Sequence, residues 1–158
     1  MVALTADRII KKIGQAGELY YRLIILVGPA GSGKTAALQA VHERTMTPYV
    51  NVNLELSRRM LNLTERQRAL QLPRLLAEIA DASATDVVLL DNIEVLFDVL
   101  LRQDPLRLLQ GLSRNRTVVV AWSGSIDGEH LVYAMPDHPE YRRYPLQDFL
   151  VVNAETIA

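Results

Sequence analysis

The sequence contains no cysteine. Disulfide bonds, zinc sites with thiolate ligands and a cysteine nucleophile are therefore excluded. Its three histidines are scattered along the chain, so a histidine-based metal site is not expected. No apolar run approaches the length of a membrane span, and residues 1–10 lack the apolar core of a signal peptide. We expect a cytoplasmic protein that makes no membrane contact.

The chain also lacks a large net charge of either sign, since its net charge is −1. The protein as a whole therefore has no positive field that would attract nucleic acid. Lysine is rare: three lysines stand against fourteen arginines, and none follows Lys34. The Asn-Lys-x-Asp motif of guanine-specific GTPases is therefore absent. A length of 158 residues suits one domain with its own core, so we expect residues 1–158 to form a single domain.

A glycine-rich segment, G-P-A-G-S-G-K-T, occupies residues 28–35 and fits the pattern G-x-x-x-x-G-K-[ST]. The branched apolar run at 23–27 precedes it and is typical of a strand buried on both faces. Residues 35–44 have the composition of a helix. Because a strand, a glycine loop and a helix are the context in which this pattern binds phosphates, the sequence predicts a nucleotide site.

Each residue type in this loop has a chemical reason. Glycines let backbone N–H groups approach the phosphates closely, and the helix start adds the positive end of its dipole. Lys34 supplies a charge to the β- and γ-phosphates, so we count it as catalytic, and the Thr35 hydroxyl can coordinate Mg²⁺. We expect ATP and Mg²⁺ as cofactors. The expected ATP-binding residues are Gly28, Pro29, Ala30, Gly31, Ser32, Gly33, Lys34, Thr35 and Ala36.

A second apolar run, residues 86–91, ends in the carboxylate of Asp91. Ligands bind at the carboxyl ends of strands in open α/β sheets, so Asp91 is expected to hold Mg²⁺ opposite Thr35. Many ATPases place a glutamate directly after this aspartate, but here that position is Asn92 and the nearest acid is Glu94. Glu94 orients the attacking water only if the chain turns sharply after the strand. Otherwise it is a solvated acid at a helix start, and both interpretations stay open.

Further strands predicted at 48–53, 118–122 and 146–152 complete an α/β P-loop NTPase fold. We expect three layers (α/β/α) around a mainly parallel five-stranded sheet in the AAA-like order 5-1-4-3-2, without a C-terminal helical lid. In that order Ser123, which follows the fourth strand, is placed to sense the γ-phosphate; the alternative is an ordinary turn serine. Residues 124–145 are expected to be irregular apart from a short strand near 130–134.

Arginines gather in the helical stretch 54–82, and Pro73 is expected to break this stretch or to open its second helix. Its charged face is either solvated or a surface for nucleic acid or a partner. Arg142 and Arg143 lie just before the final strand, where AAA-type ATPases often carry the arginine that reaches a neighbour's γ-phosphate. That role needs self-association or a partner ATPase. The alternative is a surface turn with its tyrosines packed inward.

Over nearly its whole length the chain resembles the BrxF family of small P-loop proteins from type-three bacteriophage exclusion (BREX) systems. The matching segments are residues 28–35, L-L-D-N-I-E at 89–94, D-P-L at 104–106, W-S-G at 122–124 and H-P-E-Y-R at 138–142. The resemblance implies an anti-phage defence protein beside a larger ATPase, a DNA methyltransferase, a helicase and a phosphatase-like protein. We expect a homo-oligomer, a complex with the larger ATPase, or both, with any DNA contact indirect.

Three functions remain open from the sequence. The first is an ATP-driven switch whose ATPase activity is weak or stimulated by a partner. The second is an adaptor that binds ATP without turnover, which Asn92 after Asp91 favours. The third is a nucleotide kinase, but the sequence shows no insertion typical of a kinase lid.

Overall fold

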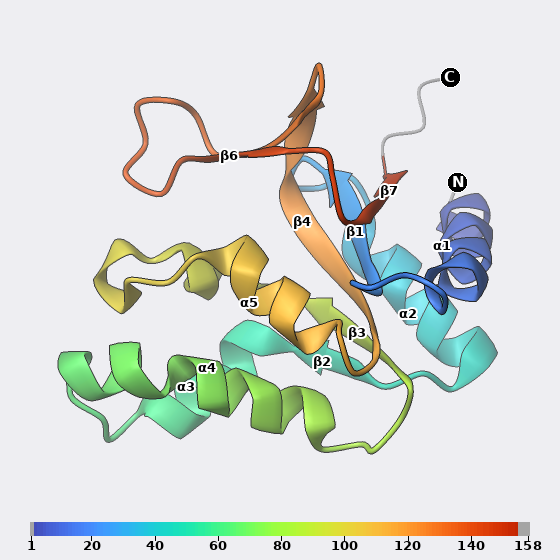
Figure 1. Ribbon diagram of the computed structural model, residues 1–158. Helices are drawn as coiled ribbons and strands as arrows, with labels where there is room; N and C mark the ends of the chain where they lie inside the picture. The colour runs from blue at the N-terminus through green and yellow to red at the C-terminus, as the bar shows by residue number, and fades with distance from the viewer. Residues whose placement is uncertain (1, 155–158) are drawn as a thin grey trace.

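The computed structural model describes residues 2–154 and shows a parallel sheet between two layers of helices (Figure 1). The strands of the parallel sheet are ordered β2-β3-β4-β1-β7, and each neighbouring pair runs in parallel. This is the predicted order with β7 as the final strand, so the predicted fold class is confirmed. The five strands are β1 (Leu23–Gly28), β2 (Tyr49–Asn51), β3 (Val87–Asp91), β4 (Thr117–Asp127) and β7 (Leu150–Asn153).

Helices cover both faces of this sheet, which is why β1 and β3 are apolar along nearly their whole length, with Asp91 as the last residue of β3. Along β1, Ile24 and Leu26 face the layer formed by α1 (Val2–Ala16) and α2 (Lys34–Thr45). Leu23, Ile25 and Val27 face the other layer, in keeping with the two-residue period of a strand. That second layer holds α3 (Val52–Met60), α4 (Glu65–Asp81) and α5 (Pro105–Leu112) (Figure 1).

The strand β4 continues past the parallel sheet and becomes the first strand of an antiparallel extension. Its residues 124–127 pair with β5 (His130–Tyr133), which pairs with β6 (Arg142–Pro145). The prediction of an irregular 124–145 segment is therefore wrong, except for the short strand near 130–134. The turn between β4 and β5 has two residues, and Gly128 takes the first place with φ of 59°. Glycine at that place suits a tight hairpin turn.

Pro73 neither breaks the helical stretch nor opens its second helix, so that expectation is wrong. The division falls at residues 61–64, where Thr64 begins α4 with a capping box shared with Gln67. Pro73 lies inside α4, and its missing N–H leaves the carbonyl of Ala69, four residues earlier, without its helical donor. The Gln103 side chain replaces that donor, because its Nε2 lies 2.7 Å from the Ala69 oxygen.

The segment after β3 contains two short 3₁₀ helices, η1 (Glu94–Phe97) and η2 (Val99–Leu101), before α5 begins. Asp104 caps α5 and Pro105 takes its first position, as the sequence predicted. Phe97 of η1 stacks on Tyr133 of β5 with ring centroids 3.6 Å apart. This contact holds the antiparallel extension against the segment that leaves β3. Within residues 2–154, no helix is both long and apolar enough to cross a membrane.

Candidate nucleotide-binding site

The glycine loop joins the end of β1 to the start of α2, as predicted. Gly31 and Gly33 have φ of 80° and 89°, a backbone region that side chains other than glycine rarely adopt. Glycine suits position 28 for a different reason: a Cβ there would lie 2.5 Å from the Ser32 hydroxyl oxygen and 3.0 Å from the Ala154 Cβ. The loop therefore folds tightly and is followed at once by the N-terminus of a helix, an arrangement suited to anions.

Lys34 lies inside this loop with 8% of its surface exposed. Its Nζ donates to the carbonyl oxygens of Gly28 and Pro29 at 2.8 and 2.7 Å. Burial lowers the pKa of the Lys34 ammonium, and the negative charges of Glu94 and Asp91 oppose that shift. The ammonium group of Lys34 thus lies at the centre of the loop, near the carboxylates of Asp91 and Glu94.

Asp91 lies at the end of β3 with 4% of its surface exposed and with both carboxylate oxygens hydrogen-bonded. Its Oδ2 accepts from the Thr35 hydroxyl at 2.7 Å and from the Tyr49 hydroxyl at 2.6 Å. Its Oδ1 accepts from the backbone N–H of Asn92 at 2.9 Å. Burial raises the pKa of Tyr49, and the hydrogen bond to Asp91 raises it further, so the phenol remains a donor at neutral pH.

These donors fit Mg²⁺, since Thr35 and Asp91 offer a hydroxyl and a carboxylate, the hard oxygen ligands that this ion prefers. The two side chains touch although 56 residues separate them. Among residues 2–154, no three His, Cys, Asp or Glu side chains are grouped to hold a metal by themselves. A Mg²⁺ ion at Thr35 and Asp91 would therefore take its other ligands from nucleotide phosphates and water.

Glu94 lies in the same site because the chain turns sharply after β3. Asn92 has φ of 55°, and Glu94 then opens η1. Burial raises the pKa of the Glu94 carboxyl, the charge of Asp91 raises it further, and Lys34 opposes the shift. The sharp turn that a water-orienting role requires is thus present. The role itself remains a prediction.

Ser123 lies where the parallel ladder between β1 and β4 ends, paired with Gly28. It is half-buried beside the glycine loop, and β4 runs on past it instead of ending there. The predicted position next to the loop is therefore correct, although the serine lies within a strand. Whether Ser123 senses phosphate remains a prediction.

Two tyrosines near the carboxylates were not predicted. Tyr49 bonds to Asp91 from the neighbouring strand, and burial followed by the charge of Glu94 raises the pKa of Tyr133 to about 12. No pattern in the sequence identifies either residue, because their partners lie about 40 positions away in the chain. Only the pairing of β2 with β3, and of β5 with β4, brings these rings to the site.

Arg142 and Arg143 both lie in β6, and their hydrogen bonds lead to other parts of the fold. Arg142 donates to the Gln103 carbonyl oxygen at 3.0 Å, and Arg143 pairs with Asp127 at 2.8 Å. Tyr144 packs over Trp122 and donates to Asp104, which matches the inward packing of the alternative interpretation. Residues 136–140 form turns, as that interpretation expected, but Arg142 and Arg143 themselves lie in a strand. The role of either arginine at a neighbour's phosphate stays a prediction.

The strand order, the glycine loop and the buried Asp91 together define an α/β protein of the P-loop nucleotide-binding class. Residues 24–123 match the model of the ATPase family associated with various cellular activities (AAA), and the chain belongs to this family. Membership implies nucleotide binding, usually with Mg²⁺, and AAA proteins often form oligomers.

No curated protein matches the sequence. Among solved structures, one of PCH-2 from C. elegans aligns with 18% sequence identity and a TM-score of 0.44. The alignment covers 99% of this chain and 40% of the PCH-2 chain. The chain thus spans less than half of that protein's length.

Proposed function

We propose that this chain binds ATP with Mg²⁺ and acts as an ATPase or ATP-dependent switch whose turnover is weak or needs a partner. The observation that carries the proposal is the 2.7 Å hydrogen bond between Thr35 and Asp91, directly beside the buried Lys34. A hydroxyl, a carboxylate and an ammonium are the groups that hold Mg²⁺ and the β- and γ-phosphates in P-loop proteins.

Each residue then has a defined task. Lys34 exchanges the carbonyl oxygens of Gly28 and Pro29 for phosphate oxygens, while Thr35 and Asp91 hold the metal ion. Bound Mg²⁺ supplies positive charge to the phosphates. Glu94 orients a water molecule against the γ-phosphate, and Ser123 contacts that phosphate from β4. The remaining ATP contacts come from the loop backbone between Gly28 and Ala36.

An adaptor that binds ATP without hydrolysing it is the second candidate. The observation in its favour is Asn92, which occupies the position directly after Asp91 with its backbone N–H bonded to that carboxylate. Glu94 reaches the site from two residues further on and starts a 3₁₀ helix. A nucleotide kinase is less well supported, since no lid-like insertion was recognised in the sequence.

The setting we propose is an anti-phage defence assembly of the BREX type, supported by the segments that resemble the BrxF family. In that setting the protein is a single cytoplasmic domain that forms homo-oligomers, joins a larger ATPase of the same system, or does both. Its contact with DNA is then indirect, through those partners. Light scattering after size exclusion, with and without ATP and Mg²⁺, measures the oligomeric part of this proposal.

Thermal unfolding tests ATP binding. ATP with Mg²⁺ at 100 times its dissociation constant stabilises a protein by about 2.7 kcal/mol, which for this chain length raises the melting temperature by roughly 5–10 °C. The Lys34→Ala variant is expected to lose most of that shift. GTP is expected to do no better than ATP, because the guanine motif is absent. An unchanged melting curve at saturating ATP would contradict the proposal.

Product analysis then separates the candidate functions. An ATPase releases ADP and phosphate, an adaptor leaves ATP intact, and a kinase phosphorylates an acceptor. The same incubation with Lys34→Ala protein controls for contaminating activity, since a genuine signal is lost with that side chain.

A further inference from the structure

The arginines of the helical stretch differ in what they contact. Arg58 and Arg59 pair with Glu55, while Arg74 pairs with Glu78. Arg68 donates to backbone carbonyls, including that of Met60 at 3.0 Å. Within residues 2–154, the side chain of Arg66 makes neither a hydrogen bond nor an ion pair. Arg58 and Arg59 share one carboxylate, and Arg68 meets only carbonyl oxygens. Among the arginines of this stretch, Arg66 is therefore the one whose side chain has no polar partner in the described part of the chain.

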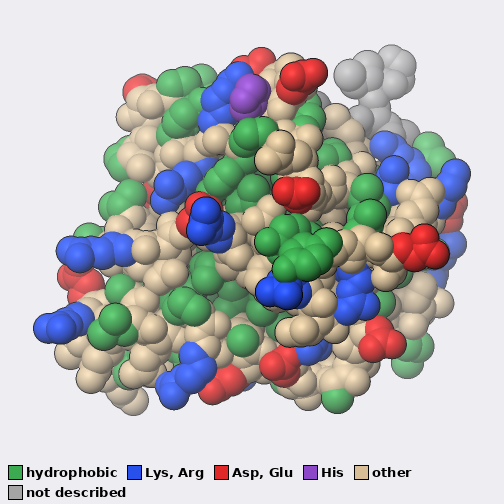
Figure 2. Space-filling view, in the orientation of Figure 1, with side chains coloured by type: hydrophobic (Ala, Val, Ile, Leu, Met, Phe, Trp, Pro, Cys, Tyr) green, Lys and Arg blue, Asp and Glu red, His purple; other side chains and the backbone are tan. Residues whose placement is uncertain are grey.

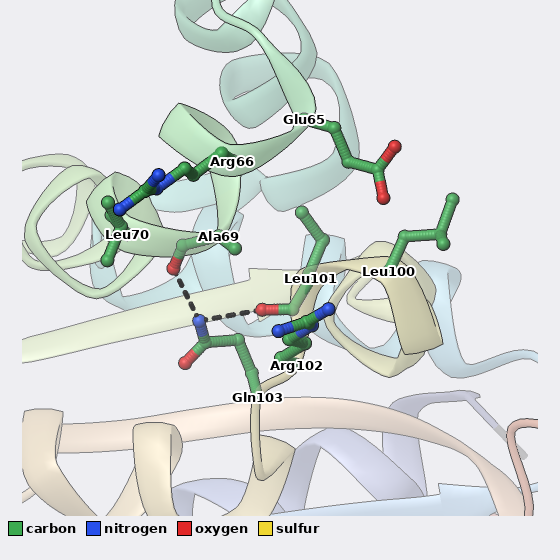
Figure 3. Close-up of a pocket in the computed structure, with 8 residues that line it drawn as sticks. All are labelled: Glu65, Arg66, Ala69, Leu70, Leu100, Leu101, Arg102 and Gln103. Carbon is green, nitrogen blue, oxygen red and sulfur yellow. Dashed lines mark hydrogen bonds between the residues drawn. The ribbon is translucent and has the colours of Figure 1, made fainter.

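Arg66 lies beside a groove between α4 and the segment that contains η2. The groove has a volume of about 750 Å³. Arg66, Ala69 and Leu70 line it from α4, and Leu100 and Arg102 line it from the opposite wall (Figure 3). Arg102 also lacks an ion pair within the described part of the chain. The α4 wall thus presents Leu70 and Arg66 beside Glu65, and the opposite wall presents Leu100, Leu101 and Arg102.

The two walls are held together by Gln103. Because Pro73 has no N–H, the carbonyl of Ala69 is free to accept from Gln103 Nε2 at 2.7 Å, and the same nitrogen donates to Leu101 (Figure 3). The Gln103 carbonyl in turn accepts from Arg142 at 3.0 Å. The groove is therefore a preformed feature whose floor is tied to α4 and to β6.

Two leucines of the groove are unusually exposed, with 71% of Leu70 and 55% of Leu100 accessible to water, while Leu101 is buried. The groove lies at the left of the view in Figure 1, between α4 and the segment after β3. In the same view, Figure 2 shows basic and hydrophobic side chains next to one another over this part of the surface. Apolar surface gathered in a groove and bordered by charge is typical of a site where a protein segment binds.

We propose that this groove docks a short segment of a partner protein that carries leucine-like side chains next to aspartate or glutamate. The apolar side chains would cover Leu70 and Leu100. The carboxylates would meet Arg66 and Arg102, whose planar guanidinium groups bind carboxylates through two parallel hydrogen bonds. A nucleic acid fits less well, because the lining has no aromatic side chain for base stacking.

Selection from a random dodecapeptide library displayed on phage tests this docking site. The full chain is immobilised, and selection is run in parallel on wild type and on the double variant Arg66→Glu, Arg102→Glu. Wild type is expected to enrich peptides that combine acidic and leucine-like residues. The selected peptides, made synthetically, are expected to bind the double variant at least about 100-fold more weakly, roughly tenfold for each charge pair removed.

Matched controls separate the groove from general charge. Lys11→Glu reverses one exposed charge on α1, which covers the other face of the sheet, and is expected to leave peptide affinity unchanged. Leu70→Ser is expected to weaken binding, and because Leu70 is exposed the fold should persist, as a melting curve will verify. None of these variants alters the glycine loop, so the ATP-induced melting shift reports separately on the proposed nucleotide site.

Three results would overturn the docking proposal. The first is no enrichment on wild type above the background of the double variant, or selected peptides without an acidic consensus. The second is a peptide that binds wild type and the double variant equally. The third is a labelled single-stranded DNA 12-mer that binds wild type, loses binding in the double variant and displaces the peptides, because the groove would then be a nucleic-acid site.

Discussion

The hydroxyl of Tyr49 donates to Asp91 Oδ2 at 2.6 Å, on the same oxygen that accepts from Thr35. Tyr49 reaches it from the edge strand β2, where it pairs with Leu89. Partners of this kind orient a carboxylate toward a metal ion, and their removal typically costs metal affinity. Tyr49 therefore holds the carboxylate that our proposal assigns to Mg²⁺.

We predict that Tyr49→Phe weakens Mg²⁺ affinity in the presence of ATP by about 10- to 100-fold. Calorimetric titration of Mg²⁺ into the protein with ATP measures this. ATP binding without Mg²⁺ should be unchanged, because the loop contacts remain. Asp91→Asn serves as the comparison. It should lower Mg²⁺ affinity at least as much as Tyr49→Phe, since it removes the negative charge of the carboxylate itself. Equal Mg²⁺ affinity in Tyr49→Phe and wild type would show that the phenol only packs.

The second prediction concerns turnover. If Glu94 orients the attacking water, Glu94→Gln should lower ATP hydrolysis by about 100-fold or more while nucleotide affinity stays within a few-fold of wild type. Phosphate release measured beside ATP binding checks both quantities. Hydrolysis at the wild-type rate in the Gln variant would leave Glu94 as a structural acid at the start of η1.

The pH dependence of stability offers an independent test of the environment of Glu94. Its folded pKa lies above the ordinary value of 4.5, chiefly because the carboxyl is buried. The stability that the neutral carboxyl contributes is complete below the unfolded pKa and is lost as pH rises through the folded pKa. Without nucleotide, Glu94→Gln should therefore melt higher than wild type at neutral pH, and the difference should vanish toward pH 4. A constant difference across this range would contradict the shifted pKa.

If either Arg142 or Arg143 reaches a neighbour's phosphate, replacing that arginine by alanine is predicted to lower ATP turnover more than replacing the other. Loss of such an arginine should lower turnover by about 10³-fold or more with little change in ATP affinity. Mixing the inactive Ala variant with Glu94→Gln subunits should partly restore hydrolysis, because each supplies the group that the other lacks. A monomer whose activity depends on neither arginine nor on concentration would exclude this role. In that case Arg142 serves only its hydrogen bond to Gln103.

Gly124 is predicted to be essential for the antiparallel extension. A Cβ there would collide with the Val132 carbonyl oxygen and would lie 2.8 Å from Trp122 Nε1, which donates to that same oxygen. Gly124→Ala should destabilise the protein by about 1–3 kcal/mol through overpacking, seen as a lower melting temperature. The matched control is Gly111→Ala in α5, where the added Cβ meets no atom within 4 Å apart from its chain neighbours and the helix's own backbone. If both variants melt alike, the close β4–β5 pairing at Gly124 is not a stability determinant.

The sequence was sufficient to predict the parallel sheet and the phosphate loop. Strands such as β1 and β3 are covered on both faces, so they appear as continuous apolar runs that need no tertiary information to be recognised. The antiparallel extension was missed for the opposite reason. From 123 to 127, β4 is only half-buried or exposed, and its polar residues resemble a loop.

Local backbone chemistry determined the loop that begins at Gly28. Side chains other than glycine rarely adopt the positive φ of Gly31 and Gly33, and a Cβ at position 28 would crowd the Ser32 side chain. The place of Asp91 at the end of a buried strand also follows from the sequence, because the residue ends an apolar run. Tertiary structure alone decided that Tyr49 bonds to Asp91, and that Gln103 fills the gap left by Pro73. These contacts join residues 42 and 34 positions apart, and only the packing of whole strands and helices brings such distant groups within hydrogen-bonding distance.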